Sequence, residues 1–345
     1  MSSDPIILAI ESSCDDTSAA VLKGRKVLSN IVANQEIHRK YGGIVPELAS
    51  RVHQQNIIPV VDTAINQADI KKEEISAIAF TKGPGLLGSL LVGSSFAKAF
   101  ALARDIPLIS VNHMQGHILS HFIKDSNHHT PSFPFLCLTV SGGHTQIVKV
   151  QSTIDMEIIG TTLDDAAGEA FDKSANILGL PYPGGLLIDK YSKNGDNNAF
   201  TFGKPNIKGL DFSFSGLKTS ILYKIKDNIK ENPSFVKENM SDLCASIQYS
   251  IISILLEKIQ KASELTQIKQ IAIAGGVSAN SFLRSELEFL ANKKGYSIFI
   301  PKLEYCTDNA AMIAIAGYEK LKKGIYSPLS LKANPNLPLN DGAIE

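Results

Sequence analysis

The sequence predicts an α/β protein made of two related lobes, and three observations support this fold class. Short apolar runs with the length of buried strands alternate with longer stretches that have helical spacing. The strand, polar turn and strand that open the chain recur after a polar, proline-containing segment at residues 124–134. The length of 345 residues also suits two domains, because a domain usually has about 100–200 residues. We expect one lobe over residues 1–130 and another over residues 131–345, with the last helix packing back toward the first lobe.

The first half alternates strands with helices. Its expected elements are, in order, strands at residues 6–10 and 19–22, a helix at 46–65, a strand at 75–80, a helix at 86–103 and a strand at 106–111. The polar turn ESSCDDTS separates the first two strands, and Pro46 suits the first turn of a helix. The helix at 86–103 is rich in small residues, which would suit either a partner helix or packing within the molecule.

The second half begins with a copy of the opening pattern. Ile7-Leu8-Ala9-Ile10 aligns without gaps with Phe135-Leu136-Cys137-Leu138, and Ala19-Ala20 then falls on Ile147-Val148. Two unrelated hairpins could give this similarity, but its position after the linker favours an internal duplication. The later expected elements are a helix at 163–178, a loop at 181–185, an irregular stretch near 192–212, helices to about 265, a strand at 271–274, a helix from about 278, a strand at 297–301 and a helix from 308. Two related lobes imply a cleft between them, where ligands commonly bind.

Composition narrows the class of protein further. Hydrophobic residues make up 44% of the chain, and 34 basic residues balance 34 acidic residues. A zero net charge gives no global electrostatic argument for a polyanionic partner, although a local basic patch remains possible. The four cysteines form no CxxC pair, and the N-terminus lacks the basic region of a signal peptide. No apolar run reaches the ~18 residues of a membrane span, so we expect a cytoplasmic protein without membrane association.

The segment His113-Met114-Gln115-Gly116-His117 is the strongest candidate for a metal site. Its histidines are spaced i and i+4, so on one helical face both imidazoles can reach one ion. The segment follows directly on a buried strand, and α/β sheets place their sites at the carboxyl ends of strands. Histidines that only cap or pack are the alternative. Met114 stands where a HExxH metallopeptidase has its glutamate, which disfavours a peptidase.

A third metal ligand must come from elsewhere, and Asp308 is the strongest candidate. Because it follows a strand and precedes a helix, an ordinary helix N-cap is an equally good interpretation. Two histidines and one carboxylate with open coordination positions suit ferrous iron, the ion we favour, or zinc.

Three glycine pairs stand at strand or loop ends in the second half. Ser141-Gly142-Gly143 follows a strand, Gly184-Gly185 ends a loop, and Gly275-Gly276 precedes a helix. Glycines at such places let backbone N–H groups approach a phosphate or carboxylate, although tight turns also use them. Together they resemble the phosphate and adenosine loops of the actin-like ATPase (ASKHA) superfamily, in which two RNase H-like lobes clamp a nucleotide in a central cleft.

Carboxylates cluster in two places. Asp164, Asp165, Glu169 and Asp172 form an acidic segment of a predicted helix, and the last three share one face. This face would be either a solvated surface or a wall that binds ribose hydroxyls. Glu11, Asp15 and Asp16 in the first polar turn raise the same choice, and they could face the reaction centre.

Ten short motifs follow one another in a fixed order along nearly the whole chain, and such a combination is highly specific for a protein family. They are IESSCDDT at 10–17, VPELASR at 45–51, GPGL at 83–86, NHMQGH at 112–117, VSGGHT at 140–145, GEAFDK at 168–173, YPGG at 182–185, FSGLK at 214–218, GGVSAN at 275–280 and TDN at 307–309. In this combination the sequence resembles the TsaD family, the bacterial tRNA adenosine threonylcarbamoyltransferases.

The resemblance implies the reaction and the residues that serve it. The threonylcarbamoyl group of threonylcarbamoyl-adenylate would pass to the exocyclic amine of the adenosine 3′ to the anticodon, in tRNAs that read codons beginning with A, and AMP would leave. His113, His117 and Asp308 would hold the metal, and Asp15 or Glu11 could orient or deprotonate the amine. The residues that would bind the adenylate donor are Thr139, Val140, Ser141, Gly142, Gly143, Asp172, Gly185, Asp189 and Asn280. The implied partners are tRNA, a TsaB-like inactive paralogue and a TsaE-like P-loop ATPase.

Other functions remain as alternatives. A small-molecule kinase of the same actin-like fold would need Mg²⁺ held by acidic residues, and it would have no use for the HMQGH segment. A non-catalytic scaffold like TsaB would not need the intact set of metal and glycine-turn residues. Within the family pattern, Asp16 stands where many relatives have glutamate.

Overall fold

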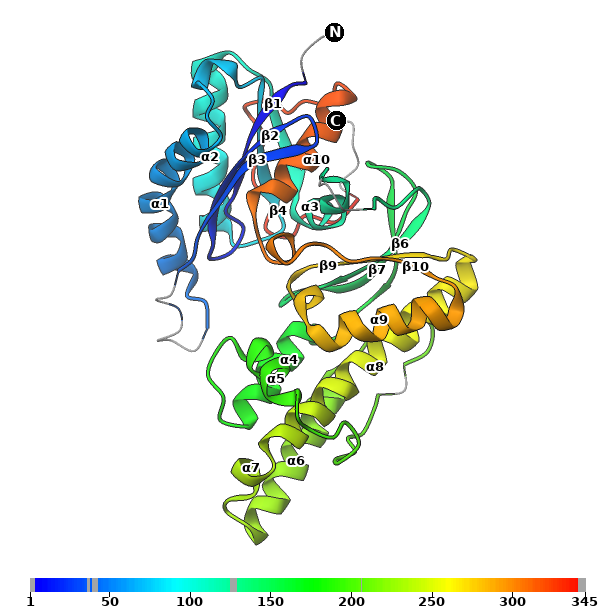
Figure 1. Cartoon of the computed structure of the whole chain (residues 1–345). Coiled ribbons are helices and arrows are strands. Elements are labelled where there is room, and N and C mark those ends of the chain that lie inside the picture. Colours follow the sequence, from blue (N-terminus) through cyan, green and yellow to red (C-terminus); the bar gives the residue numbers. More distant parts are fainter. Residues whose placement is uncertain (1–3, 36–37, 39–42, 125–128, 206, 341–345) are drawn as a thin grey trace. The chain divides into compact units, whose positions relative to one another are not determined.

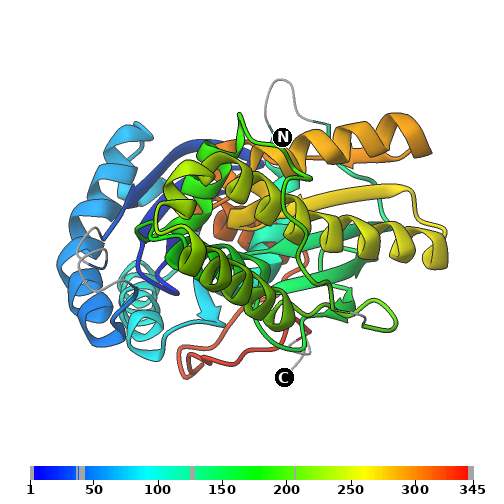
Figure 2. The same ribbon diagram turned by 90° about the horizontal axis from the view of Figure 1, so that it is seen from below.

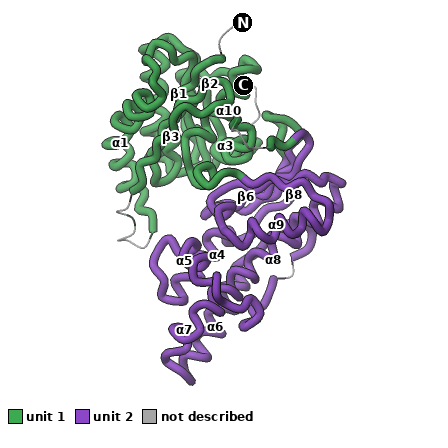
Figure 3. Tube along the Cα trace, viewed as in Figure 1, with its two compact units in different colours: residues 1–131, 151–156, 301–345 green, residues 132–150, 157–300 purple. Residues whose placement is uncertain are grey.

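The computed structural model describes residues 4–35, 38, 43–124, 129–205 and 207–340, and it divides into two compact units (Figure 3). Unit 1 comprises residues 1–131, 151–156 and 301–345, and unit 2 comprises residues 132–150 and 157–300. This division differs from a single cut at residue 130, because residues 301–345 fold with the first unit. The reason is packing: helix α10 (Ala310–Lys322) lies against the sheet of unit 1. Residues 125–128 of the expected linker lie outside the described residues.

Unit 1 is a five-stranded sheet with helices on both faces (Figure 1). Its strands, in the order β3-β2-β1-β4-β5, are β3 (Lys26–Ala33), β2 (Thr17–Lys23), β1 (Ile6–Glu11), β4 (Ala77–Gly83) and β5 (Leu108–Asn112). Strand β1 pairs antiparallel with β2 and parallel with β4. The short helix α3 (His113–Leu119) follows β5 directly, and short 3-10 turns cover Lys72–Glu74, Ser120–Phe122 and Leu303–Tyr305.

Helices α1 (Pro46–Gln67) and α2 (Leu87–Arg104) lie side by side in both views (Figures 1 and 2) and cover one face of this sheet. Their buried side chains join Leu8 and Ile10 of β1 in one core cluster. Helix α10 covers the opposite face, where Gly317 lies against Ala79 of β4. A Cβ atom at Gly317 would stand 2.6 Å from the Cβ atom of Ala79, so only glycine allows this close approach.

Unit 2 repeats the same sheet topology with a larger helical insertion. Its strands, in the order β10-β9-β6-β7-β8, are β10 (Ser297–Phe299), β9 (Gln270–Ala274), β6 (Phe135–Val140), β7 (Thr145–Val150) and β8 (Met156–Thr161). Its helices are α4 (Ala167–Ile177), α5 (Gly184–Ser192), α6 (Ser215–Glu231), α7 (Phe235–Glu238), α8 (Met240–Thr266) and α9 (Ser281–Lys294), with a 3-10 turn at Gly276–Ala279. The core of unit 2 gathers around α8, whose buried residues pack with β6, β9 and the neighbouring helices.

The predicted internal duplication is confirmed at the level of strand register. Ile10 pairs with Ala19 in the first hairpin, and Leu138 pairs with Ile147 in the second, as the gapless alignment requires. In both sheets the first strand of the hairpin also pairs parallel with the strand that follows the intervening helices.

Sequence patterning missed the outermost strand on the hairpin side of each sheet. Strand β3 and strand β8 each end a sheet, and many of their residues are half-buried or exposed. Such strands lack the continuous apolar run or the strict alternation that identifies a buried strand. Helix α4 also begins later than expected, at Ala167 rather than near residue 163.

The approach of α10 to β4 gives a test of packing. Replacing Gly317 with alanine should lower the free energy of unfolding by about 1–3 kcal/mol, because the added methyl group overpacks a rigid contact. The matched control is Gly216→Ala in α6, where a Cβ atom meets nothing within 4 Å. There the higher helix propensity of alanine should leave the stability equal or raise it by up to ~1 kcal/mol. Urea unfolding of both variants would contradict this account if the two transitions moved together.

Candidate functional site

The metal candidates lie on a short helix at the carboxyl end of a buried strand, as predicted. Helix α3 begins at His113, directly after β5, and Asn112 is its N-cap. The side-chain oxygen of Asn112 accepts hydrogen bonds from the backbone N–H groups of Met114 (2.9 Å) and Gln115 (3.3 Å). This cap fixes the start of the helix and therefore the direction of both histidines.

His113, His117 and Asp308 form one cluster within unit 1. Their ligand atoms lie within 4.8 Å of one another. Oδ1 of Asp308 lies 3.1 Å from Nε2 of His117 and 3.4 Å from Nε2 of His113. The cap of α10 is Asn309, whose side chain accepts from Met312 N, so the N-cap interpretation of Asp308 is wrong. The carboxylate is directed instead at the two imidazoles.

The surroundings of this cluster fit a divalent metal. Nδ1 of His113 lies 3.1 Å from Oε2 of the buried Glu11, so Nε2 is the nitrogen left for an ion. A carboxylate behind a histidine is the usual way to orient a metal-binding imidazole. His117 is also buried, and among the described residues its Nδ1 has no hydrogen-bond partner. Two imidazole nitrogens and one carboxylate oxygen thus converge on one point.

The charges in the cluster favour a cation there. Burial would lower the pKa of His113, but Asp308 and Glu11 outweigh it and hold that pKa well above its usual value. Burial would likewise raise the pKa of Asp308, yet the neighbouring His113 and His117 keep it well below the ordinary range. The pKa of Glu11 is lowered despite burial, mainly by the charge of His113 and its hydrogen bond. The buried Glu11 and the partly exposed Asp308 therefore stabilise positive charge at this position.

Glu11 is fully enclosed by partners. Its Oε1 accepts from the backbone N–H of Ser13 (2.5 Å), and its Oε2 accepts from the hydroxyl of Thr81 (2.6 Å) and lies beside His113. With no exposed surface, it is placed to orient His113 rather than to meet a substrate. Asp15 lies half-buried in the turn that follows Glu11.

His53 of α1 holds this turn and was not identified from the sequence. Its Nε2 donates to the carbonyl oxygen of Cys14 (3.0 Å), and Thr17 Oγ1 lies 2.8 Å from its Nδ1. The side chain is completely buried, and burial lowers its pKa. A histidine 36 residues from Thr17 gives no local signal, so only the fold reveals this contact.

In unit 2, the predicted donor-binding residues lie on neighbouring loops. The Ser141-Gly142-Gly143 turn joins β6 to β7, and both glycines are exposed with open space where a side chain would be. Thr139 and Val140 are fully buried in β6, so they support the turn rather than present side chains to a ligand. The carbonyl of Ser141 accepts from Gly168 N (3.1 Å), which joins this turn to α4.

The same loops continue around the end of the sheet. Oδ1 of Asp172 accepts from the backbone N–H groups of Gly184 (2.7 Å) and Gly185 (3.1 Å), which fixes the start of α5. Burial raises the pKa of Asp172 and outweighs these two donors. Asp189 on α5 accepts from both the backbone N–H and the hydroxyl of Ser281, the first residue of α9.

Asn280 and Gly275 complete the arrangement. The side chain of Asn280 caps α9 by accepting from Leu283 N and donates to Gln248 Oε1 (2.7 Å). Gly275 has φ +89°, and a Cβ atom there would lie 2.4 Å from the carbonyl oxygen of Val140. These contacts link the Ser141 turn through α4, α5 and the start of α9 to Gly275, which lies back against Val140, all within unit 2.

The carboxylates before and within α4 divide into two roles. Asp165 and Glu169 each lie 2.7 Å from Nζ of Lys173, which fits the solvated-surface interpretation. Asp164, the first carboxylate of this acidic segment, accepts from Ser213 Oγ, Ser215 Oγ and Phe214 N at the start of α6. Burial would raise the pKa of Asp164, but these hydrogen bonds lower it.

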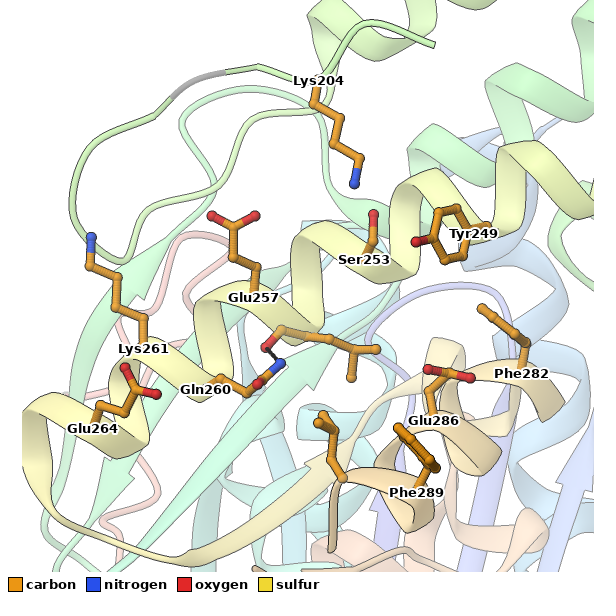
Figure 4. Close-up of a pocket in the computed structure, with 12 residues that line it drawn as sticks. Lys204, Tyr249, Ser253, Glu257, Gln260, Lys261, Glu264, Phe282, Glu286 and Phe289 are labelled. Carbon is orange, nitrogen blue, oxygen red and sulfur yellow. Dashed lines mark hydrogen bonds between the residues drawn. The ribbon is translucent and has the colours of Figure 1, made fainter. Parts of the chain in front are cut away.

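A separate groove of about 490 Å³ lies between α8 and α9 (Figure 4). Tyr249, Phe282 and Phe289 line it together with charged side chains. None of the predicted site residues lines this groove.

The fold and site define a protein with two units of the same sheet topology, one with a histidine–aspartate cluster that could hold a metal and the other with glycine-rich loops. The family model of TsaD, tRNA N6-adenosine threonylcarbamoyltransferase, matches residues 26–315, and the chain belongs to this family. It is therefore a tRNA-modifying transferase, as the sequence predicted, and the kinase alternative is set aside.

Relatives with the same activity in their names match this sequence over almost its full length. The chain is 61% identical over 335 residues to the tRNA N6-adenosine threonylcarbamoyltransferase of Riemerella anatipestifer, covering 97% of this chain and 98% of that protein. It is 50% identical to the protein of that name from Thermosipho africanus, covering 97% and 100%. The crystal structure of full-length HypF in the phosphate- and nucleotide-bound form matches with TM-score 0.62 and 12% identity, covering 95% of this chain and about half (48%) of HypF. This likeness confirms the predicted actin-like fold.

The turn after β1 gives a pH-dependent prediction. Burial, helped by Asp15, Asp308 and Glu11, raises the pKa of Asp16 to about 7. Since the unfolded carboxyl titrates near its ordinary pKa of about 4, the folded state binds more protons between these values, and stability falls as the pH rises through this window. Asp16→Asn should therefore stabilise the metal-free protein at pH 8 by about 1–2 kcal/mol, allowing for solvent screening, and much less at pH 4. Equal effects at both pH values in thermal unfolding would contradict the raised pKa.

Proposed function

We propose that this chain transfers the threonylcarbamoyl group of threonylcarbamoyl-adenylate to the N6 amine of the adenosine 3′ to the anticodon, in tRNAs that read codons beginning with A. The observation that carries this proposal is the coincidence of TsaD membership with the intact cluster of His113, His117 and Asp308. The alternatives of a peptidase and a scaffold have no comparable support.

We assign the donor to the loops of unit 2. The exposed Ser141-Gly142-Gly143 turn would offer backbone N–H groups to the phosphate or carbonyl side of the donor. Asp172 would face the ribose, because Oδ1 alone accepts both backbone N–H groups and leaves Oδ2 for a hydroxyl. Asp189 and Asn280 use their side chains to join α5, α8 and α9, so we assign them to shaping the adenosine site with Gly185.

His113, His117 and Asp308 would hold the metal. The nitrogen and oxygen ligands suit Fe²⁺, our preferred ion, or Zn²⁺. When bound there, the ion would supply Lewis acidity that polarises the carbamoyl group. Glu11 would hold His113 in the tautomer with Nε2 unprotonated, which is the form that binds a cation.

The transfer needs no covalent enzyme intermediate. The N6 amine of the adenosine attacks the carbamoyl carbon, the new C–N bond forms, and the bond from that carbon to the phosphate oxygen breaks to release AMP. The amine loses one proton, and the half-buried Asp15 is the carboxylate we propose to accept it or to orient the amine. Glu11 has the positioning role because its oxygens are already occupied.

We also propose that the chain works with partners in the cytoplasm. A zero net charge is unusual for a tRNA-binding chain, since phosphate contacts normally dominate affinity, so a TsaB-like paralogue and a TsaE-like ATPase would assist. On α2 the small residues pack inward, while Leu87, Leu91 and Leu102 remain about half to two-thirds exposed and could meet a partner. Among the described residues, no helix combines the length and apolarity that crossing a bilayer requires.

The metal role is tested by His117→Ala. We expect the variant to lose the bound divalent ion and to transfer labelled threonylcarbamate to tRNA at least about 100-fold more slowly in a single turnover, with partner subunits present. The exposed His129 is the matched control, and His129→Ala should behave as wild type. Transfer by His117→Ala at the wild-type rate without bound metal would show that the metal role is wrong.

A further inference from the structure

We infer that residues 333–340, the C-terminal segment, act as positioning residues for the metal centre by holding helix α3 in place. This inference rests on the metal role in the proposed function. The inference concerns which contacts keep the two imidazoles at a fixed distance from Asp308. The three ligand residues alone do not provide these contacts.

Helix α3 is too short to hold its own position. It has seven residues, all of them buried. A helix of fewer than about 12 residues gains little stability from its own hydrogen bonds, so tertiary contacts decide where it lies. On one side that contact is α10, where a Cβ atom at Gly116 would stand 3.0 Å from Ile313 and 3.4 Å from Met312.

The C-terminal segment supplies the remaining anchor through two amide side chains. Nδ2 of Asn112 donates to the carbonyl oxygen of Pro338 (2.8 Å), while Oδ1 of the same side chain caps α3. Nε2 of Gln115 donates to the carbonyl oxygen of Leu339 (2.8 Å). Gln115 lies between the two histidine ligands in sequence, and both amides are almost completely buried. The segment therefore binds both the N-cap residue and the first turn of α3.

The segment is itself fixed to the end of β4. The backbone N–H of Asn334 donates to the carbonyl of Lys82 (2.9 Å), and Gly85 N donates to the carbonyl of Pro335 (3.1 Å). The approach is so close that a Cβ atom at Gly83 would overlap the Asn334 carbonyl oxygen, at 1.9 Å. Leu337 and Leu339 are each only 4% exposed.

These contacts matter because metal sites tolerate little displacement. Ligand distances must stay within about 0.2 Å of their preferred values, and changing groups that orient the ligands typically weakens metal binding by about 10–100-fold. Releasing α3 from the segment would move the two histidines relative to Asp308, while every ligand remained present.

The test measures metal affinity in the full chain. Metal-free protein is titrated with Zn²⁺ against a chromophoric chelator, with wild type, Asn112→Ser and Gln115→Met compared at 25 °C. Serine still caps a helix well but cannot reach Pro338, and methionine keeps the length of Gln115 without its N–H donor. We expect each variant to bind Zn²⁺ roughly 10-fold more weakly than wild type.

Two controls separate positioning from general destabilisation. Ile65→Ala removes a buried side chain of α1 and should lower the stability of unit 1 without changing Zn²⁺ affinity. Leu329→Ala changes a 45% exposed residue that precedes the segment, and it should leave Zn²⁺ affinity unchanged. The double variant Leu337→Ala, Leu339→Ala should weaken Zn²⁺ binding as the amide variants do. Circular dichroism shows whether each protein is folded at the titration temperature. A variant that is not folded is excluded, and the comparison then rests on the remaining variants.

The outcomes distinguish this inference from the function on which it rests. Folded amide and leucine variants with wild-type Zn²⁺ affinity would overturn the positioning role and leave the proposed function standing. An equal loss of affinity in Ile65→Ala would overturn it as well. If wild type itself binds no Zn²⁺ or Fe²⁺, the metal role in the proposed function fails instead.

Discussion

The structure of unit 1 depends on how the carboxylates of Glu11 and Asp308 are neutralised beside one buried imidazole. Glu11 and Asp308 approach His113 from opposite ring nitrogens, at 3.1 Å and 3.4 Å. Burying an unpaired charge is costly, so the fully buried Glu11 requires this imidazole, while the partly exposed Asp308 is shared between His113 and His117. Glu11 ends β1 and Asp308 precedes α10, which means that this one ring joins the central strand to the last helix. The proposed metal ion would meet the same demand for positive charge.

Much of this arrangement could be predicted because its signals are local. The i, i+4 spacing of His113 and His117 after an apolar strand was visible in the sequence, and so was the duplicated hairpin, whose register agrees residue for residue. Asp308 and Asn309 could not be separated by pattern, since either can cap a helix, and only the hydrogen bond to Met312 N assigns the cap to Asn309.

What the sequence could not reveal rests on contacts between distant residues. His53 meets Cys14 and Thr17 across the packing of α1 on β2, and Asp164 meets Ser213 and Phe214, 49 and 50 residues along the chain. The edge strands β3 and β8 were missed for a different reason, because partial exposure removes the apolar pattern that marks a strand.

Unit 1 is built from the two ends of the chain, and this has a consequence for the order in which its parts are synthesised. Its sheet comes from the first 112 residues, but the helix that covers one face of that sheet begins at Ala310. A ribosome therefore exposes the strands long before α10 exists, and all of unit 2 is translated in the interval. Until then the contact of α10 with Ala79 and the contact of Asp308 with His113 cannot form. The three proposed metal ligands therefore come together only in the last tenth or so of synthesis, once residue 308 has been made.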